Sequence, residues 1–167
     1  MLLTLAHLFL RSSPPARLRR LFRRYSRIYY DFLRVAEQRA LAIADSPAVA
    51  EAWRVSFALQ RALKERQVLR VEVLLNDGPD TYLSWTNLDD IIERVDSGWT
   101  ESDEDNAIRT SDYYAAINRS ISNLKARFDS ESLSKGGDEL AQDPLYCSAR
   151  NALAMKAREI SKVSLKN

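Results

Sequence analysis

The side chains best suited to chemistry in this sequence are the arginines between residues 11 and 34. This segment reads RSSPPARLRRLFRRYSRIYYDFLR, with eight arginines, no lysine and one acid, Asp31. A guanidinium group binds phosphate and carboxylate groups, and aromatic rings between arginines can stack on nucleic-acid bases. We take six arginines as candidate partner- or phosphate-binding residues: Arg17, Arg20, Arg23, Arg24, Arg27 and Arg34. A basic, aromatic-rich amphipathic helix of this kind indicates a negatively charged partner.

A second group of charged residues lies in the middle of the chain and is acidic. Residues 77–112 carry eleven acids against two arginines, a net charge of −9. We expect six of these acids to form a docking face for another neighbour: Asp89, Asp90, Glu93, Asp103, Glu104 and Asp105. Residues 1–39, in contrast, carry nine arginines against two acids, a net charge of +7. The overall charge of +2 therefore hides a strong separation of charge along the chain.

Part of the acidic segment resembles a metal-binding pattern. Asp89, Asp90 and Glu93 have the spacing DDxxE, and several carboxylates that converge on one point can hold magnesium for chemistry on diphosphates. The apolar residues between these acids define the buried side of a helix, which leaves the acids on the solvent side. No second acidic helix is available to complete an octahedral site. We therefore expect neither a metal nor another cofactor.

Nucleophilic catalysis has little support in the rest of the sequence. The only histidine, His7, lies in an apolar run, and the only cysteine, Cys147, has no other histidine to activate it. Cys and His ligands are too few for a zinc site, and there is no glycine-rich phosphate loop. We therefore expect that the protein is not an enzyme. A metal-dependent enzyme is the least favoured interpretation.

These features predict a non-catalytic binding or adaptor protein. It would be a small subunit of a multi-protein complex and would dock through the arginine-rich helix and the acidic segment. The alternative is a sequence-nonspecific nucleic-acid-binding protein, in which the same arginines neutralise the phosphates of DNA or RNA. Docking on a membrane surface is less favoured, because the apolar stripe of this helix is needed to cover other elements of the fold.

Two features bear on the location of the protein. A single cysteine in 167 residues is typical of a reducing compartment and favours the cytoplasm. The alternative is the mitochondrion, because the first thirty residues contain no acid, several serines and many arginines, as transit peptides do.

The elements that position these residues are predicted to be mainly helical. Only four glycines and five prolines occur, which favours long helices. The spacing of apolar residues predicts helices over residues 16–44 and 48–66. Residues 67–75 alternate and are rich in β-branched residues, the turn residues 76–80 follow, and residues 81–85 can form a return strand. This pattern predicts a β-hairpin.

The predicted fold class is mostly α, with five to six helices and a single β-hairpin (about 67–75 and 81–85) after the third helix, counting a short apolar helix expected over residues 2–10 as the first. A helix pair followed by a hairpin would also fit a winged-helix arrangement. Residues 96–106 are expected to form an acidic loop. The chain is expected to comprise an apolar N-terminal segment (1–15), a helical domain with the hairpin (16–128), a polar linker (129–143) and a C-terminal helix packing on the same domain (144–167).

Overall fold

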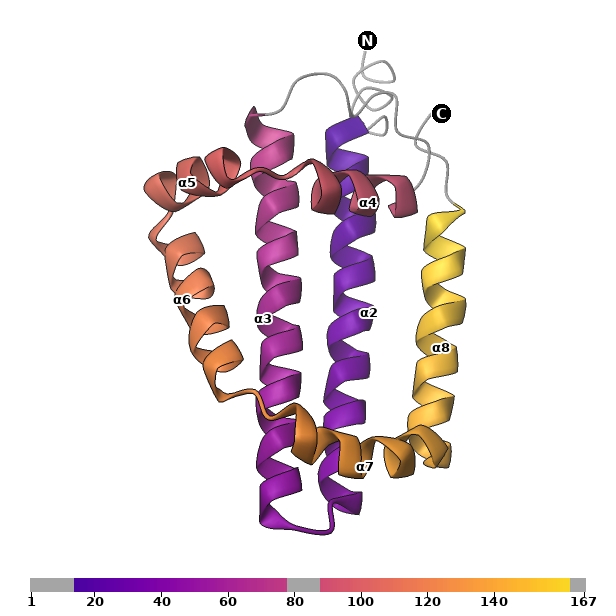
Figure 1. The fold of residues 1–167 in the computed structure, drawn as a ribbon. Coiled ribbons are helices and arrows are strands. Elements are labelled where there is room, and N and C mark those ends of the chain that lie inside the picture. Colours follow the sequence, from indigo (N-terminus) through magenta and orange to yellow (C-terminus); the bar gives the residue numbers. More distant parts are fainter. Residues whose placement is uncertain (1–13, 78–87, 163–167) are drawn as a thin grey trace.

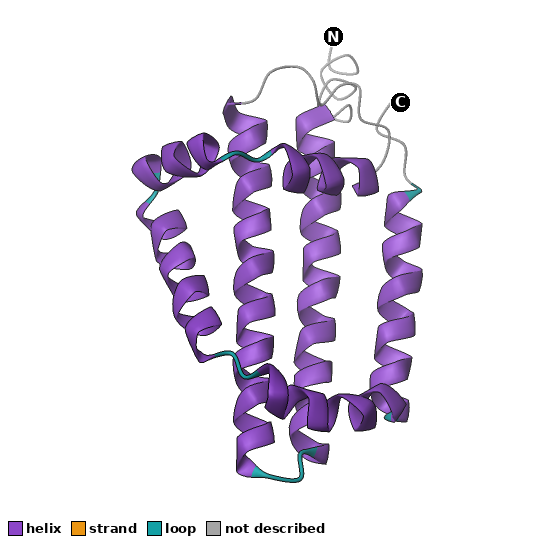
Figure 2. Cartoon of the chain, viewed as in Figure 1, coloured by secondary structure: helices purple, strands orange, loops and turns teal. Residues whose placement is uncertain are grey.

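The structure, a computed structural model, describes residues 14–77 and 88–162 (Figure 1). These residues form seven helices and no strand (Figure 2). The helices are α2 (Pro14–Ile43), α3 (Pro47–Asp77), α4 (Leu88–Gly98), α5 (Glu101–Thr110), α6 (Asp112–Arg127), α7 (Ser130–Gln142) and α8 (Pro144–Ser161). The prediction of a mostly α protein is confirmed.

Three long helices, α2, α3 and α8, run side by side and form one layer (Figure 1). In this layer α2 is central and packs on α3 on one side and on α8 on the other. One face of the layer is crossed by α4 and α7, which lie toward opposite ends of α2 (Figure 1). At the outer edge, α6 packs along α3 and α5 packs on α6.

The arginine-rich helix α2 forms because its apolar residues recur every three or four positions. Pro14 occupies its first turn, where the N–H that proline lacks has no helical partner. Leu18 and Phe22 are each 1% exposed, and Leu33 is fully buried. The predicted helix over residues 16–44 is therefore confirmed, with ends that differ by one or two residues from the observed ones.

Two clusters of buried residues hold the elements together. The first cluster joins the start of α2, the end of α3, α4 and the end of α8: Leu18, Phe22, Val71, Val95 and Ile160. The second cluster joins the other ends of α2 and α3 and is covered by α7: Leu33, Ala36, Ala40, Val49, Trp53, Phe57 and Leu140. Because α2 and α3 contribute to both clusters, this helix pair is the scaffold that positions every other element.

The predicted β-hairpin is wrong. Residues 67–75 continue α3, and the second predicted strand, 81–85, lies outside the described residues. Val71 is 2% exposed in the first cluster, and Val68 and Leu74 pack beside it at the three-residue spacing of a helix. Burial of this face outweighs the weak β preference of the valines. The winged-helix arrangement needs the hairpin and is dropped with it.

Two segments that we expected to lack regular structure are helical. Residues 129–143, the predicted linker, contain α7, which begins where Asp129 accepts hydrogen bonds from the N–H groups of Glu131 and Ser132 at 3.1 and 3.2 Å. Residues 96–106, the predicted acidic loop, contain the first half of α5. These segments are short polar helices because their caps satisfy the N–H groups of the first turn. The division of the chain into domains stays a prediction.

Candidate functional site

The exposed side of α2 carries a row of arginines. We call Arg20, Arg24, Arg27 and Arg34 the arginine row, since all four are exposed. Their separations of four, three and seven residues place them on one face of the helix. The buried residues Leu18, Phe22 and Leu33 occupy the opposite face, against α4 and α7. At 1.5 Å of rise per residue, the row extends for roughly 21 Å.

Two further arginines of α2 are tied to α3. Arg23 donates to Glu72 at 3.0 Å, and Arg19 Nε lies 3.5 Å from the other carboxylate oxygen of Glu72. The Arg23 side chain remains 65% exposed, so it still adds positive charge next to the row. Arg17, the remaining predicted binding residue, is partly buried in the first turns of α2. The structure therefore assigns part of the predicted binding set to intramolecular contacts.

Three members of the row have no internal partner. Within residues 14–77 and 88–162, the side chains of Arg24, Arg27 and Arg34 form no ion pair or hydrogen bond. Asp31, which is exposed, shares their face and lies between Arg27 and Arg34 in sequence. It is the one acid on this side of α2, so the row keeps a net positive charge.

The acids of α4 lie away from the arginine row. Ile92 and Val95 of α4 pack on the buried side of α2, opposite the row. Asp89 and Glu93 are exposed, and Asp89 accepts a hydrogen bond from the Ser161 hydroxyl at 3.2 Å. Asp90 belongs to α4, and its side chain lies outside what the structure describes.

The acids of α5 are partly used inside the molecule. Asp103 closes a capping box with Thr100, whose hydrogen bonds lower the pKa of Asp103. Glu104 forms an ion pair with Arg70 of α3, and Asp105 is exposed. In the described part of the chain, no three acidic, His or Cys side chains converge closely enough to hold a metal ion.

An apolar groove lies beside the arginine row, between α2 and α8. Its volume is about 160 Å³. The lining residues from α2 are Ile28, Asp31, Phe32 and Val35, and those from α8 are Ala149, Ala152, Leu153 and Lys156. Its floor is therefore aliphatic and aromatic, and the charged residues that line it are Asp31 of α2 and Lys156 of α8.

One ion pair fixes α8 against α2 at the end of this groove. Arg39 donates to both carboxylate oxygens of Asp143, at 3.1 and 2.7 Å. The hydrogen bonds from Arg39, and next the one from the Tyr146 N–H, lower the pKa of Asp143 to about 2. Asp143 also caps α8, so the same carboxylate sets both the start of α8 and its position on α2.

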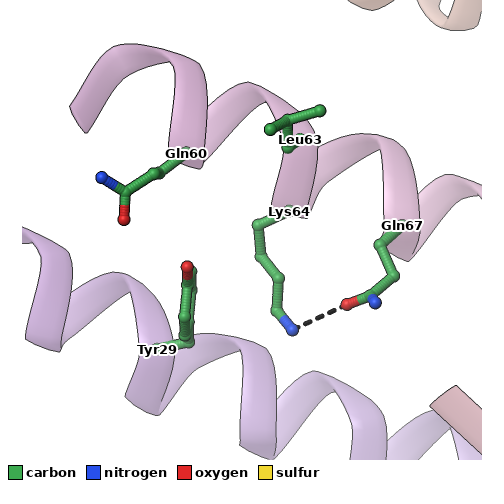
Figure 3. A pocket seen from close by; sticks show the side chains of 5 residues that line it. All are labelled: Tyr29, Gln60, Leu63, Lys64 and Gln67. Atoms are coloured by element: carbon green, nitrogen blue, oxygen red, sulfur yellow. Dashed lines mark hydrogen bonds between the residues drawn. The ribbon is translucent and has the colours of Figure 1, made fainter. Parts of the chain in front are cut away.

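A buried lysine, which the sequence analysis missed, lies on the opposite face of the layer. Lys64 of α3 is 8% exposed, and its ammonium lies 4.2 Å from the ring centre of Tyr25, 4.8 Å from that of Tyr29 and 5.4 Å from that of Phe22. It donates to the Gln67 side-chain oxygen at 2.7 Å (Figure 3). Burial lowers the pKa of Lys64 from 10.5 to about 8, although the charge of Asp96 opposes this shift.

A pocket of about 230 Å³ opens next to this lysine. Its lining residues are Tyr29, Gln60, Leu63, Lys64 and Gln67 (Figure 3). Gln67 also donates to Asp96 of α4 at 2.9 Å. The sequence did hold a signal for this site, because Lys64 lies seven residues after Phe57 and eleven after Trp53. That spacing places a charged residue on the core face of α3.

Comparison with protein-family models, with curated proteins and with solved structures gave no match to this chain. No helix in the described residues is long and apolar enough to cross a membrane. The described residues thus define an all-helical protein with a cationic surface on one face of a three-helix layer and a buried lysine on the other.

Proposed function

We propose that this protein is a non-catalytic adaptor that binds an acidic, amphipathic helix of a partner protein along the arginine row. The observation that carries the proposal is the set of three exposed arginines, Arg24, Arg27 and Arg34, which have no internal partner among the described residues. They lie on α2, the helix that also forms one wall of an apolar groove. The proposal includes a role as a small subunit of a multi-protein complex.

Charge supports this proposal. Like charges one helical turn apart destabilise a helix by about 0.2–0.5 kcal/mol per pair, so Arg24 and Arg27 repel each other when no partner is bound. Acidic side chains of a partner would relieve that repulsion. They would also accelerate the encounter and fix its orientation, which are the main contributions of surface charge to binding.

The groove favours a protein partner over nucleic acid. Ile28, Phe32 and Leu153 provide an apolar floor that can take up the apolar side chains of a helix laid along α2 and α8. A nucleic-acid backbone has no comparable apolar anchors, since most of its contacts are made through phosphate and sugar.

Nucleic acid is the second candidate, and one observation favours it. The acidic helix α4 packs on the face of α2 opposite the arginine row. Asp89 and Glu93 would therefore not face a phosphate backbone that lies on the row. The row would then contact phosphates without reading sequence.

The lone cysteine supports a cytoplasmic location, which is part of the proposal, with the mitochondrion as the alternative. Cys147 is a free thiol whose Sγ donates to the Ala141 carbonyl at 3.1 Å. Free thiols are typical of reducing compartments.

The proposal is tested by fluorescence anisotropy with two labelled probes. The first is an amphipathic helical peptide with leucines on one face and glutamates on the other, and the second is a mixed-sequence DNA duplex. The test variant carries Arg24→Glu, Arg27→Glu and Arg34→Glu. The matched control carries Arg119→Glu, Lys125→Glu and Lys135→Glu, which makes the same change in net charge at exposed positions on α6 and α7.

We expect the native chain and the control to bind the peptide with similar affinity. The affinity of the test variant should be lower by a factor of about ten or more, because each exposed ion pair contributes up to about 1 kcal/mol. Ala152→Trp, which fills the groove, should weaken peptide binding and leave duplex binding unchanged. If the peptide does not bind and the duplex binds only when the arginine row is intact, the second candidate is supported. The logarithm of the association constant for the duplex should then fall by about three units per log unit of salt. Equal losses in the test and control variants would refute both.

A further inference from the structure

We propose that the Lys64 pocket and the pocket beside it together bind one small amphiphilic carboxylate, with its carboxylate group at Lys64 and its apolar tail among the aromatic residues of α2, α3 and α8. This site lies on the face of the layer that carries α4 and α7, opposite the arginine row, and is independent of the proposed adaptor function.

Lys64 provides the charge that the carboxylate needs. Its ammonium has three N–H groups, and one of them donates to Gln67. No carboxylate of the described residues forms an ion pair with Lys64. The charged group that acts on it is Asp96 of α4, which favours the ammonium by its charge and accepts a hydrogen bond from Gln67. The phenols of Tyr25 and Tyr29, whose rings face the ammonium, are neutral. A buried cation without a counter-ion is unfavourable, so a ligand carboxylate would complete the site.

Polar groups next to Lys64 can orient a carboxylate. The side chains of Tyr29 and Gln60 point toward the same space between α2 and α3, beside Lys64 (Figure 3). The Tyr29 hydroxyl has an O–H donor, and the Gln60 amide has N–H donors. A carboxylate can accept from several donors at once. The pocket thus joins one cation with two neutral donors, an arrangement suited to one negative charge.

The neighbouring pocket can take an apolar tail. Its volume is about 180 Å³, and its lining is mostly aromatic and apolar: Phe32, Trp53, Phe57, Leu140 and Tyr146. Gln60 and Arg150 also line it, and the Arg150 guanidinium lies 5.8 Å from the ring centre of Tyr146. Gln60 lines both pockets, so the polar and the apolar pocket lie next to each other. The Tyr29 and Phe32 rings, one from each pocket, have centres 6.5 Å apart. A carboxylate with an alkyl or aryl tail matches this order of polar and apolar surfaces.

Octanoate and decanoate, each compared with the neutral alcohol of equal length, are suitable probes for isothermal titration calorimetry. We expect the carboxylates to bind at least tenfold more tightly than the alcohols. Each added methylene should raise the affinity by up to about fourfold, as its burial predicts. Equal affinities for carboxylate and alcohol would overturn the proposed role of Lys64.

Two variants test the two pockets separately: the Lys64 pocket, proposed to hold the carboxylate, and the neighbouring pocket, proposed to hold the tail. Lys64→Met should abolish the preference for carboxylate over alcohol, whereas Lys125→Met, at an exposed position on α6, should keep it. Gly137→Leu should weaken both ligands at least tenfold, because Gly137 lines the apolar pocket and a Cβ there meets nothing within 4 Å. Its helical position also makes leucine compatible with folding. Unchanged binding in the Gly137→Leu variant would contradict the proposed tail site.

A direct readout does not depend on variants that must fold. NMR titration of the Lys64 ε-methylene signal should show its pKa rise when octanoate is added, because the bound carboxylate favours the charged ammonium. A Lys64 pKa that does not change at saturating octanoate would refute the proposal. The Lys64→Met variant should bind the acidic helical peptide as the native chain does, so a failure of one proposal is distinguishable from a failure of the other.

Discussion

Lys64 shows how three opposing effects act on one side chain. Burial disfavours its charged form, while the nearby aromatic rings and the charge of Asp96 favour it. The pKa of Lys64 falls from 10.5 to about 8, which shows that burial is the larger effect. The folded protein therefore holds this proton less tightly than the unfolded chain does. This difference links the stability of the fold to pH.

The pH dependence of stability should reveal this link. Between pH 8 and 10.5 the unfolded chain binds the Lys64 proton and the folded protein does not. The contribution of Lys64 to the free energy of unfolding therefore becomes more stabilising as the pH rises. The gain reaches at most about 1.4 kcal/mol per pH unit. We expect the native chain to become more stable relative to the Lys64→Met variant by about 2 kcal/mol between pH 7.5 and 9.5. Urea unfolding of both proteins at several pH values measures this difference.

The Lys125→Met variant is the matched control, since Lys125 is exposed on α6. Its stability relative to the native chain should stay constant over the same pH range. A constant difference for Lys64→Met as well would show that Lys64 keeps an ordinary affinity for its proton. Tyr25, Tyr29 and Tyr30 have pKa values raised above 10 by burial, so in the folded native chain they titrate above the pH range of this comparison.

At the scale of elements, the close contact of α7 with α3 depends on a glycine. A Cβ on Gly136 would lie 3.0 Å from both Val49 Cγ1 and Trp53 Nε1, two side chains of the second core cluster. Val49 is 3% exposed and Trp53 is 9% exposed, so neither can move without disturbing the core. The adjacent Gly137 has open space at the same position.

Substitution of these two glycines by alanine should therefore have opposite effects. Gly137→Ala should stabilise the protein by about 0.5–1 kcal/mol, since alanine is the better residue inside a helix. Gly136→Ala gains the same helical preference but overpacks the core, so we expect a net loss of about 1–2 kcal/mol. Urea unfolding at one pH compares the two variants directly. Equal stabilisation of both variants would contradict the close packing of Gly136 in α7 against Val49 and Trp53 of α3.

Helices with a single consistent pattern could be predicted from the sequence. For α2, the apolar stripe, the first-turn proline and the absence of glycine all indicate a helix of this length. In α3 the patterns conflicted, because Val68, Val71 and Leu74 fit both an alternating strand and one face of a helix. The turn residues Gly78 and Pro79 fit the end of a helix as well as a hairpin. Burial against α2 and α4, which local sequence does not show, decides for the helix.

The candidate sites were predictable only in part. The charge and helical spacing of Arg24, Arg27 and Arg34 indicated an exposed basic face, and the structure does place them on one. The pairing of Arg19 and Arg23 with Glu72 joins residues about fifty positions apart and leaves no local trace in the sequence. Lys64 was missed because a lysine next to a core position usually extends its charge to solvent. Here the rings of Tyr25 and Tyr29 cover it instead.

At the scale of the whole molecule, the separation of charge along the sequence becomes a separation between two faces. The arginine row lies on one face of the α2, α3 and α8 layer, and α4 with Asp89 and Glu93 lies on the other (Figure 1). The layer therefore lies between α4 and an anionic partner that approaches the row. The acid on the exposed face of α2 is Asp31, and the Debye length, over which exposed charges interact, is close to 8 Å at physiological salt.

Removal of the Asp31 charge should therefore strengthen docking on the row. Asp31→Asn keeps the size of the side chain in the groove and removes the only negative charge on this face of α2. We expect the acidic helical peptide to bind about two- to fivefold more tightly, because one exposed charge interaction contributes up to about 1 kcal/mol. Glu93→Gln makes the same change in net charge on α4 and should leave the affinity within about 1.5-fold of the native value, since α4 lies on the other face. Raising the salt to about 1 M, where the Debye length is about 3 Å, should remove the advantage of Asp31→Asn. An equal gain from both substitutions would mean that net charge, rather than the arginine row, attracts the partner.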